Sequence, residues 1–210
     1  MKNLKEKLAA VTLGLALCIS FGDANAQLGG LTKSVGIGGS GASVSADQIV
    51  GKYVAGSQHV NKAEVKMLKA VGLKDQADLA ELQAKNLTAG ATSGALEEAA
   101  KVQTDSSKAL EEAFKQSKVE MDAKSKKQFS DGMADLGRGI VQYAGMGGDV
   151  KNFSPNPTAA GAATTSAVFI VKNLPGSLKS LGSTLKGAID FAKTNNIPVP
   201  KEAADATALL

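Results

Sequence analysis

The fold is decided by residues 45 to 72, SADQIVGKYVAGSQHVNKAEVKMLKAVG. Apolar or small residues recur there at alternating steps of four and three, which places them on one stripe of an α-helix. The stripe consists of Ile49, Tyr53, Gly56, Val60, Ala63, Met67 and Ala70. Ser45 is a typical N-cap residue, and Gly72 is typical of a helix end. The sequence therefore predicts an amphipathic helix that must bury this stripe against other helices.

The helical period continues through most of the remaining chain. Residues 75 to 87 predict a shorter helix, which ends in the loop-type sequence NLTAGATSG. The heptapeptide ALEEAAK at positions 95 to 101 returns as ALEEAFK at positions 109 to 115, so one helix face stays in register over two heptads. We expect one long helix from Leu96 to Met121, supported by opposite charges four residues apart. These pairs are Glu97/Lys101, Glu111/Lys115, Glu120/Lys124 and Asp122/Lys126.

The seam of this long helix is partly polar, because Gln103 and Ser107 stand where a tightly packed bundle would have apolar residues. The pattern is most often that of an imperfect seam inside a bundle, and it also fits a face turned towards a ligand, a partner or water. Residues 129 to 143 carry a stronger stripe, which predicts a core helix ending near Gly145. Its apolar residues are Phe129, Met133, Leu136, Ile140 and Tyr143.

Residues 152 to 171 contain no charged residue, which raises the question of a membrane span. Two prolines and many Thr, Ser, Gly and Ala residues argue against one, and only residues 167 to 171, AVFIV, are strongly apolar. We therefore expect a turn at residues 152 to 157, then a helix buried inside the bundle, and no transmembrane helix in the mature chain.

Four lysines follow at a spacing of seven residues, at Lys172, Lys179, Lys186 and Lys193. We expect residues 174 to 176 to interrupt the helix, because Pro175 lacks a backbone donor, and Ser177 to cap the next helix. If the helix continues through Pro175, or resumes in phase, the lysines form one cationic stripe. Such a stripe is usually the solvated back of a helix, and contact with an anionic surface is the functional alternative.

The first 26 residues have the pattern of a bacterial Sec-type signal peptide. A lysine-rich start precedes an uncharged run of 14 residues, which is too short to span a bilayer. Small residues at positions 24 and 26 predict cleavage between Ala26 and Gln27. Lipidation at Cys18 is an alternative, although Leu17 stands where such sites usually have a small residue.

Residues 27 to 45 are rich in Gly and Ser and predict a flexible leader. Within them Gly36, Gly38 and Gly41 match the dinucleotide-binding pattern G-x-G-x-x-G. That motif requires a buried strand before it and a β-α-β unit around it, and the sequence predicts neither. We therefore expect a leader here, followed by a single helical domain at residues 46 to 210.

Composition excludes several classes of function. Without the signal the chain has 21 basic and 18 acidic residues, and this small, dispersed excess does not fit a nucleic-acid-binding protein. The mature chain has no Cys for a disulfide, and with one His we expect no zinc site, other metal or cofactor. A Ser-His-Asp triad would need His59, which lies on a regular helix and has no G-x-S-x-G partner motif.

The sequence therefore predicts an all-α antiparallel bundle of about five or six helices in an exported protein, periplasmic or secreted. We expect a non-enzymatic binding or scaffold protein with an unidentified partner. One alternative is reversible binding of envelope lipid or lipopolysaccharide through amphipathic helices and the lysine stripe. Another is a hydrolase that uses Ser183 and Lys186, which have S-x-x-K spacing but lack the companion motifs of that class.

Overall fold

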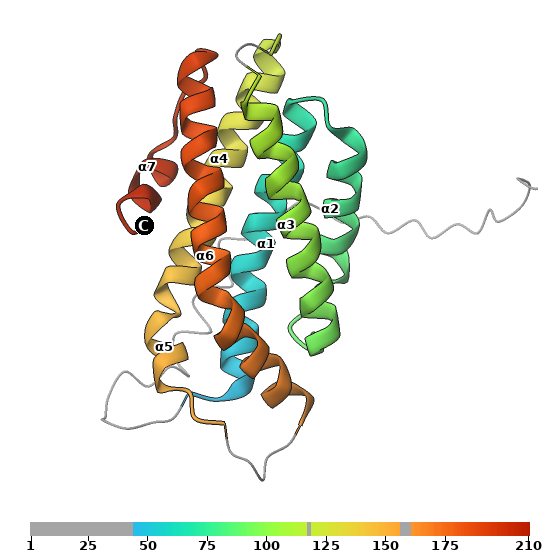
Figure 1. Ribbon diagram of the computed structural model, residues 1–210, viewed down its shortest axis with the longest axis vertical. Coiled ribbons are helices and arrows are strands. Elements are labelled where there is room, and N and C mark those ends of the chain that lie inside the picture. Colours follow the sequence, from blue (N-terminus) through green and yellow to red (C-terminus); the bar gives the residue numbers. More distant parts are fainter. Residues whose placement is uncertain (1–43, 117–118, 156–160) are drawn as a thin grey trace, which may run out of the picture. The chain divides into compact units, whose positions relative to one another are not determined.

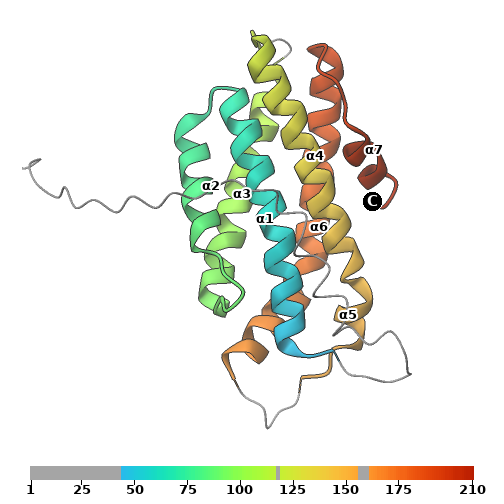
Figure 2. The same cartoon turned by 180° about the vertical axis from the view of Figure 1, so that it is seen from behind.

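The computed structural model describes residues 44–116, 119–155 and 161–210, which form a bundle of helices without a strand (Figure 1). The helices are α1 (Ala46–Ala70), α2 (Lys74–Asn86), α3 (Ser93–Phe114), α4 (Ala123–Gly145), α5 (Gly147–Asn152), α6 (Ala162–Thr194) and α7 (Lys201–Thr207). Consecutive long helices run in opposite directions, whereas the neighbours α3 and α6 run in the same direction (Figure 1, Figure 2). The predicted all-α bundle is confirmed, with five long helices and the short α5 and α7.

Several predictions concern residues outside the described part of the chain. They are the signal peptide, its cleavage between Ala26 and Gln27, lipidation at Cys18, and nearly all of the leader at residues 27 to 45. These four stay predictions.

Helix α1 begins and ends as the sequence predicts. The Ser45 hydroxyl accepts a hydrogen bond from the Gln48 N–H at 3.2 Å, and the Gln48 side chain accepts one from the Ser45 N–H at 3.0 Å. This capping box satisfies two backbone donors at the start of the helix. At the other end Gly72 has a φ of 86°, a conformation that glycine adopts without steric cost. Every residue of the predicted stripe is buried.

The long helix predicted from Leu96 to Met121 is wrong in its extent. Helix α3 ends at Phe114, and α4 begins only after Asp122. The Asp122 carboxylate accepts a hydrogen bond from the Ser125 N–H at 2.7 Å, so this residue is the N-cap of a new helix. The charge pairs predicted across residues 120 to 126 therefore do not lie on one helical surface.

The predicted pairs on α3 itself are also absent from the described residues. Lys115 pairs with Glu112 at 2.5 Å, three residues away, instead of with Glu111. Glu97 and Lys101 make no ion pair in the described part of α3. Pairs of this kind between exposed side chains contribute only about 0.3–0.5 kcal/mol, so other geometries readily replace them.

Helices α1 and α4 form the main helix pair of the bundle. All five residues of the α4 stripe are fully buried, which confirms that prediction. Two glycines on α4 let the backbones approach closely. A Cβ on Gly132 would lie 2.7 Å from Cγ of Met67, and a Cβ on Gly139 would lie 2.7 Å from Cγ2 of Val60. The apolar period predicted the buried face, but the closeness of this contact depends on glycine.

Helix α7 is fixed to α4 at Gly137. A Cβ there would lie 2.6 Å from the carbonyl carbon of Glu202 and 2.9 Å from the backbone nitrogen of Ala203. Both are backbone atoms, which cannot move aside as a flexible side chain can. The neighbouring Arg138 donates to the Glu202 carboxylate at 2.6 Å. Helix α7 therefore packs mainly on α4 rather than on α6.

Helix α6 continues through Pro175, so the interruption predicted at residues 174 to 176 and the cap at Ser177 are wrong. A proline inside a helix costs about 3 kcal/mol, because it removes one backbone hydrogen bond and crowds the preceding turn. Pro175 and Gly176 lie on the exposed side of α6, while Leu174 and Leu181 on either side of them are buried. Each buried Leu contributes about 1.5–3 kcal/mol, which offsets the cost of the proline.

The uncharged start of α6 is buried on one face only, so the helix expected inside the bundle is partly exposed. Ser166, Ala167 and Ile170 face the core, whereas Phe169 and Val171 are half-buried. Only one side of this segment meets other helices, and its remaining apolar side chains stay at the surface. None of the described helices is both long enough and apolar enough to cross a membrane.

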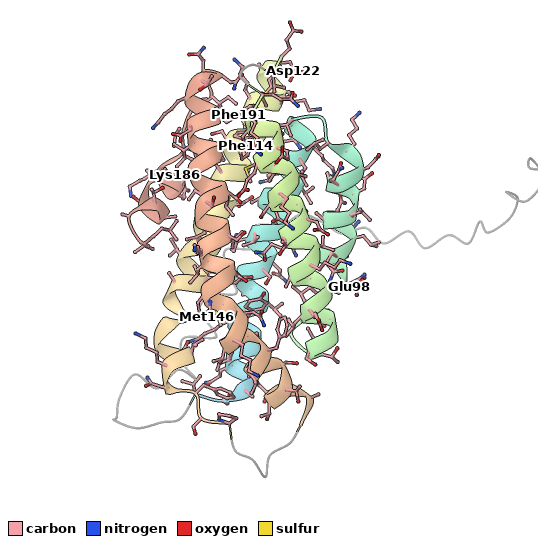
Figure 3. The ribbon with its side chains drawn as sticks, in the orientation of Figure 1. Glu98, Phe114, Asp122, Met146, Lys186 and Phe191 are labelled. Carbon is pink, nitrogen blue, oxygen red and sulfur yellow. The ribbon has the colours of Figure 1, made fainter. Side chains whose placement is uncertain are left out.

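Three phenylalanines close one end of the bundle. Phe114 at the end of α3, Phe129 near the start of α4 and Phe191 near the end of α6 have ring centroids 5.2 to 5.8 Å apart. Figure 3 labels Phe114 and Phe191 on the neighbouring helices α3 and α6 near this end. Such aromatic pairs add about 0.5–1.5 kcal/mol beyond the burial of their surface. The cluster therefore helps to hold α3 and α6 together.

Candidate functional site

The continuous α6 presents four lysines on one exposed face, here called the lysine face. It consists of Lys172, Lys179, Lys186 and Lys193. A step of seven residues is two helical turns less about 20°, so the four side chains stay on one side of the helix. Within the described residues none of them makes an ion pair. Because the helix has one acidic residue, Asp190, it carries a net charge of +3.

A groove of about 880 Å³ lies between α6 and the segment that contains α7, with Ala144 of α4 also lining it. It is here called the α6–α7 groove. Three residues of the lysine face line it, and Figure 3 shows Lys186 on the side of α6 that faces α7. The apolar lining comprises Ala144, Leu178, Ile189, Leu209 and Leu210, and the polar lining Ser183, Asp190 and Thr207. The groove thus combines cations with apolar side chains.

Leu209 and Leu210 leave apolar surface uncovered in this groove, since each is 56% exposed. Leu210 lies over Gly182 of α6. A Cβ at Gly182 would come within 2.9 Å of the Leu210 Cδ1, so the missing side chain makes room for the leucine. The contact covers only part of Leu210, and the groove beside it stays open.

A second groove carries more lysines but offers an anion less. It has a volume of about 670 Å³ between α1, α2 and α4, and it is lined by Lys66, Lys69, Lys74, Lys124, Lys127, Asp78, Asp131 and Gln128. Three of its lysines are already in ion pairs of 2.6 to 2.7 Å with carboxylates. An anion would have to compete with those carboxylates. In the described residues the lysine face has no ion pair, and Asp190 is the single carboxylate that lines the α6–α7 groove with it. The lysine face is therefore the better anion site.

A buried carboxyl group lies between α1 and α3. Glu64 is 1% exposed, and its Oε1 accepts a hydrogen bond from the Ser107 hydroxyl at 3.5 Å, which is long. Its Oε2 has no hydrogen-bond partner in the described part of the chain, and neither has Nδ2 of the nearby, buried Asn61. Burial raises the pKa of Glu64 well above 4.5, and the bond from Ser107 offsets only part of this effect. Glu64 therefore keeps its proton to a higher pH than an exposed glutamate does.

Tyr53 and Tyr143 form a second buried polar group, between α1 and α4. Their rings are stacked with centroids 5.0 Å apart, and the hydroxyls of Tyr143 and Ser57 are 2.6 Å apart. Burial raises the pKa of both tyrosines above 10.0. These hydroxyls are satisfied structural groups rather than acids available for chemistry.

His59 lies beside a network of charges on α4. Its Nδ1 is 3.9 Å from Oδ1 of Asp135, too far for a hydrogen bond. The Asp135 carboxylate instead pairs with Lys66 at 2.6 Å and with Arg138 at 3.0 Å. Partial burial lowers the pKa of His59 below 6.5, although the charge of Asp135 acts in the opposite direction. In the described residues no three His, Asp or Glu side chains gather where they could hold a metal ion.

The two halves of the S-x-x-K pattern are both exposed and both line the α6–α7 groove. A Ser-Lys mechanism requires a neutral lysine, which is normally obtained by burying it. Lys186 lies at the open surface, and no hydrogen bond between it and Ser183 is among those in the described residues. The geometry offers little support for a nucleophilic serine.

The polar seam predicted at Gln103 and Ser107 belongs to the interior, where both residues are buried. Of the two interpretations, the bundle seam fits the structure. Sequence reasoning missed Glu64, the partner of this seam, although a signal existed. Glu64 stands four residues after Val60 and four before Leu68, both fully buried, so a carboxylate interrupts an apolar row.

Comparison with family models, with curated proteins and with solved structures finds no match.

Proposed function

We propose that this chain is an exported, non-enzymatic protein that binds anionic lipid reversibly through the lysine face of α6. The observation that carries the proposal is the continuity of α6 through Pro175, which puts four lysines without ion-pair partners on one side of a single helix. The predicted signal peptide supports it, because export would bring the chain to the envelope or the medium, where anionic lipid is accessible. The wider prediction, a binding or scaffold protein with another partner, stays a prediction.

Electrostatics sets the expected strength of this attachment. A lysine near an anionic membrane surface contributes about 1 kcal/mol, so four of them contribute about 4 kcal/mol at most. Half-exposed apolar side chains at the start of α6, Phe169 and Val171, add a smaller contribution if they enter the headgroup region. Binding of this size is weak and reversible, and salt weakens it further because it screens exposed charges.

Flotation with lipid vesicles tests the proposal. We expect the protein to float with vesicles that contain phosphatidylglycerol, to remain behind with pure phosphatidylcholine, and to be released at high salt. Replacing all four residues of the lysine face with Gln should abolish flotation. A matched control replaces four other exposed lysines that lack ion-pair partners in the described residues, Lys62, Lys74, Lys101 and Lys108, and should still float. If both variants lose flotation equally, attachment depends on the net charge of the protein and not on the lysine face.

A further inference from the structure

We propose that the α6–α7 groove holds one acyl chain of an anionic lipid, with the lysines along it binding the headgroup. This inference rests on the proposed function and deepens it, because it distinguishes an amphiphile seated in a groove from a helix lying on a surface. The ligand class is a lipid with a negatively charged headgroup and at least one free acyl chain, such as a lysophospholipid.

The lining of the groove suits both the acyl chain and the negatively charged headgroup of such a lipid. Its apolar side chains come from α4, from α6 and from the segment after α7, so an acyl chain would contact three different parts of the fold. Lys179, Lys186 and Lys193 follow the same groove over two heptads, where one of them can reach a headgroup at either end of a bound chain. The volume of about 880 Å³ lies within the roughly 300–1,000 Å³ usual for small-molecule sites.

The fold explains why this space is left open. The interlocked contact at Gly137 and the ion pair between Arg138 and Glu202 hold α7 on α4. Helix α6 is therefore not the main support of α7, and the two helices have few contacts with each other. Leu210 covers Gly182, and beyond that contact the leucines remain more than half exposed. The two neighbouring leucines leave apolar surface in water beside the lysines, and a bound acyl chain would cover this surface.

Binding of single lipid molecules tests the inference separately from vesicle attachment. Isothermal titration with lysophosphatidylglycerol, kept below its critical micelle concentration, should give one bound molecule per chain. Affinity should rise about fourfold with each added methylene that enters the groove, until the groove is full. Lysophosphatidylcholine of equal chain length should bind more weakly, and changing Lys179, Lys186 and Lys193 to Gln should remove this difference.

The variant Gly182→Leu separates the groove from the lysine face. Its new side chain would meet the flexible end of Leu210, which can move aside, so we expect the bundle to remain folded, as circular dichroism would show. Its affinity for lysophosphatidylglycerol should fall tenfold or more, and it should still float with anionic vesicles. If it does not fold, the double variant Leu209→Ser with Leu210→Ser makes the same test, because it removes the exposed apolar side chains.

The outcomes separate the inference from the proposed function. Three results would contradict binding in the groove but not binding by the lysine face. They are an affinity independent of acyl-chain length, several lipid molecules bound per protein chain, and unchanged binding in the folded Gly182→Leu variant. Saturable binding of single lipids without any vesicle flotation would contradict surface attachment and support the groove.

Discussion

The carboxyl group of Glu64 on α1 and the hydroxyl of Ser107 on α3 lie 3.5 Å apart in the interior of the bundle. Within the described residues no cation pairs with this carboxyl group, and its second oxygen has no partner. A buried carboxylate without a cation is costly, so the folded chain keeps the proton to a higher pH than the unfolded chain does. Folding of this bundle is therefore linked to pH through one side chain.

The first prediction concerns this linkage. Because burial raises the pKa of Glu64 above 4.5, its contribution to stability is complete below pH 4.5 and is lost as pH rises through the pKa in the folded state. Glu64→Gln should remove this loss and raise the free energy of unfolding at pH 8 by about 1–3 kcal/mol. Urea denaturation of both proteins between pH 4 and pH 8 measures the difference.

The matched control is Glu98→Gln, because Glu98 lies on the exposed side of α3 (Figure 3). It should leave the pH dependence unchanged. If Glu64→Gln and the parent protein lose stability in parallel as pH rises, Glu64 does not hold its proton in the folded state.

The second prediction uses the single histidine of the chain, whose proton signals can be followed by NMR without assignment. The pKa of His59 should lie below 6.5, because partial burial disfavours the charged form. Asp135→Asn should lower it further, since the charge of Asp135 acts to raise it. Asp131→Asn, which changes an exposed carboxylate paired with Lys127, should have little effect. A rise in the His59 pKa on loss of Asp135 would contradict this account.

For the junction of α4 and α7, the informative change is Gly137→Ala. The added Cβ would meet the backbone of Glu202 and Ala203, so α7 must shift or detach, at a cost of about 1–3 kcal/mol. Hydrogen exchange should show lost protection of amides in α7, with α1 and α2 little affected. The control Gly148→Ala adds a Cβ where no atom lies within 4 Å. Protection of α7 equal to that of the parent would show that the contact is not tight.

A fourth prediction addresses the proline inside α6. Pro175→Ala restores a backbone donor in the helix and should raise the free energy of unfolding by about 1–3 kcal/mol, less any loss from a more flexible unfolded chain. Gly176→Ala, at the next exposed position with free space around it, should stabilise by at most about 1 kcal/mol. Urea denaturation decides the order of the two effects. A destabilised Pro175→Ala variant would indicate that the helix needs its proline.

Local sequence was sufficient for most of the helices. The period of apolar residues predicted α1 together with its cap at Ser45 and its end at Gly72, and it predicted the buried face of α4 residue by residue. These features depend on contacts within a few positions along the chain, so the pattern carries them. The same local reasoning extended α3 too far, because the period continues past Phe114 while Asp122 starts a new helix.

What the sequence determined by itself is the all-α class, the apolar faces and the spacing of the four lysines. Tertiary structure decided the rest, since it depends on residues far apart in the chain. Because Leu174 and Leu181 are buried against other helices, α6 remains helical at Pro175, and the four lysines lie on one side of it. The contact of Gly137 with Glu202 placed α7 on α4 and left the α6–α7 groove open. Packing of α3 against α1 enclosed Glu64, and removal from water, not position in the sequence, raised its pKa.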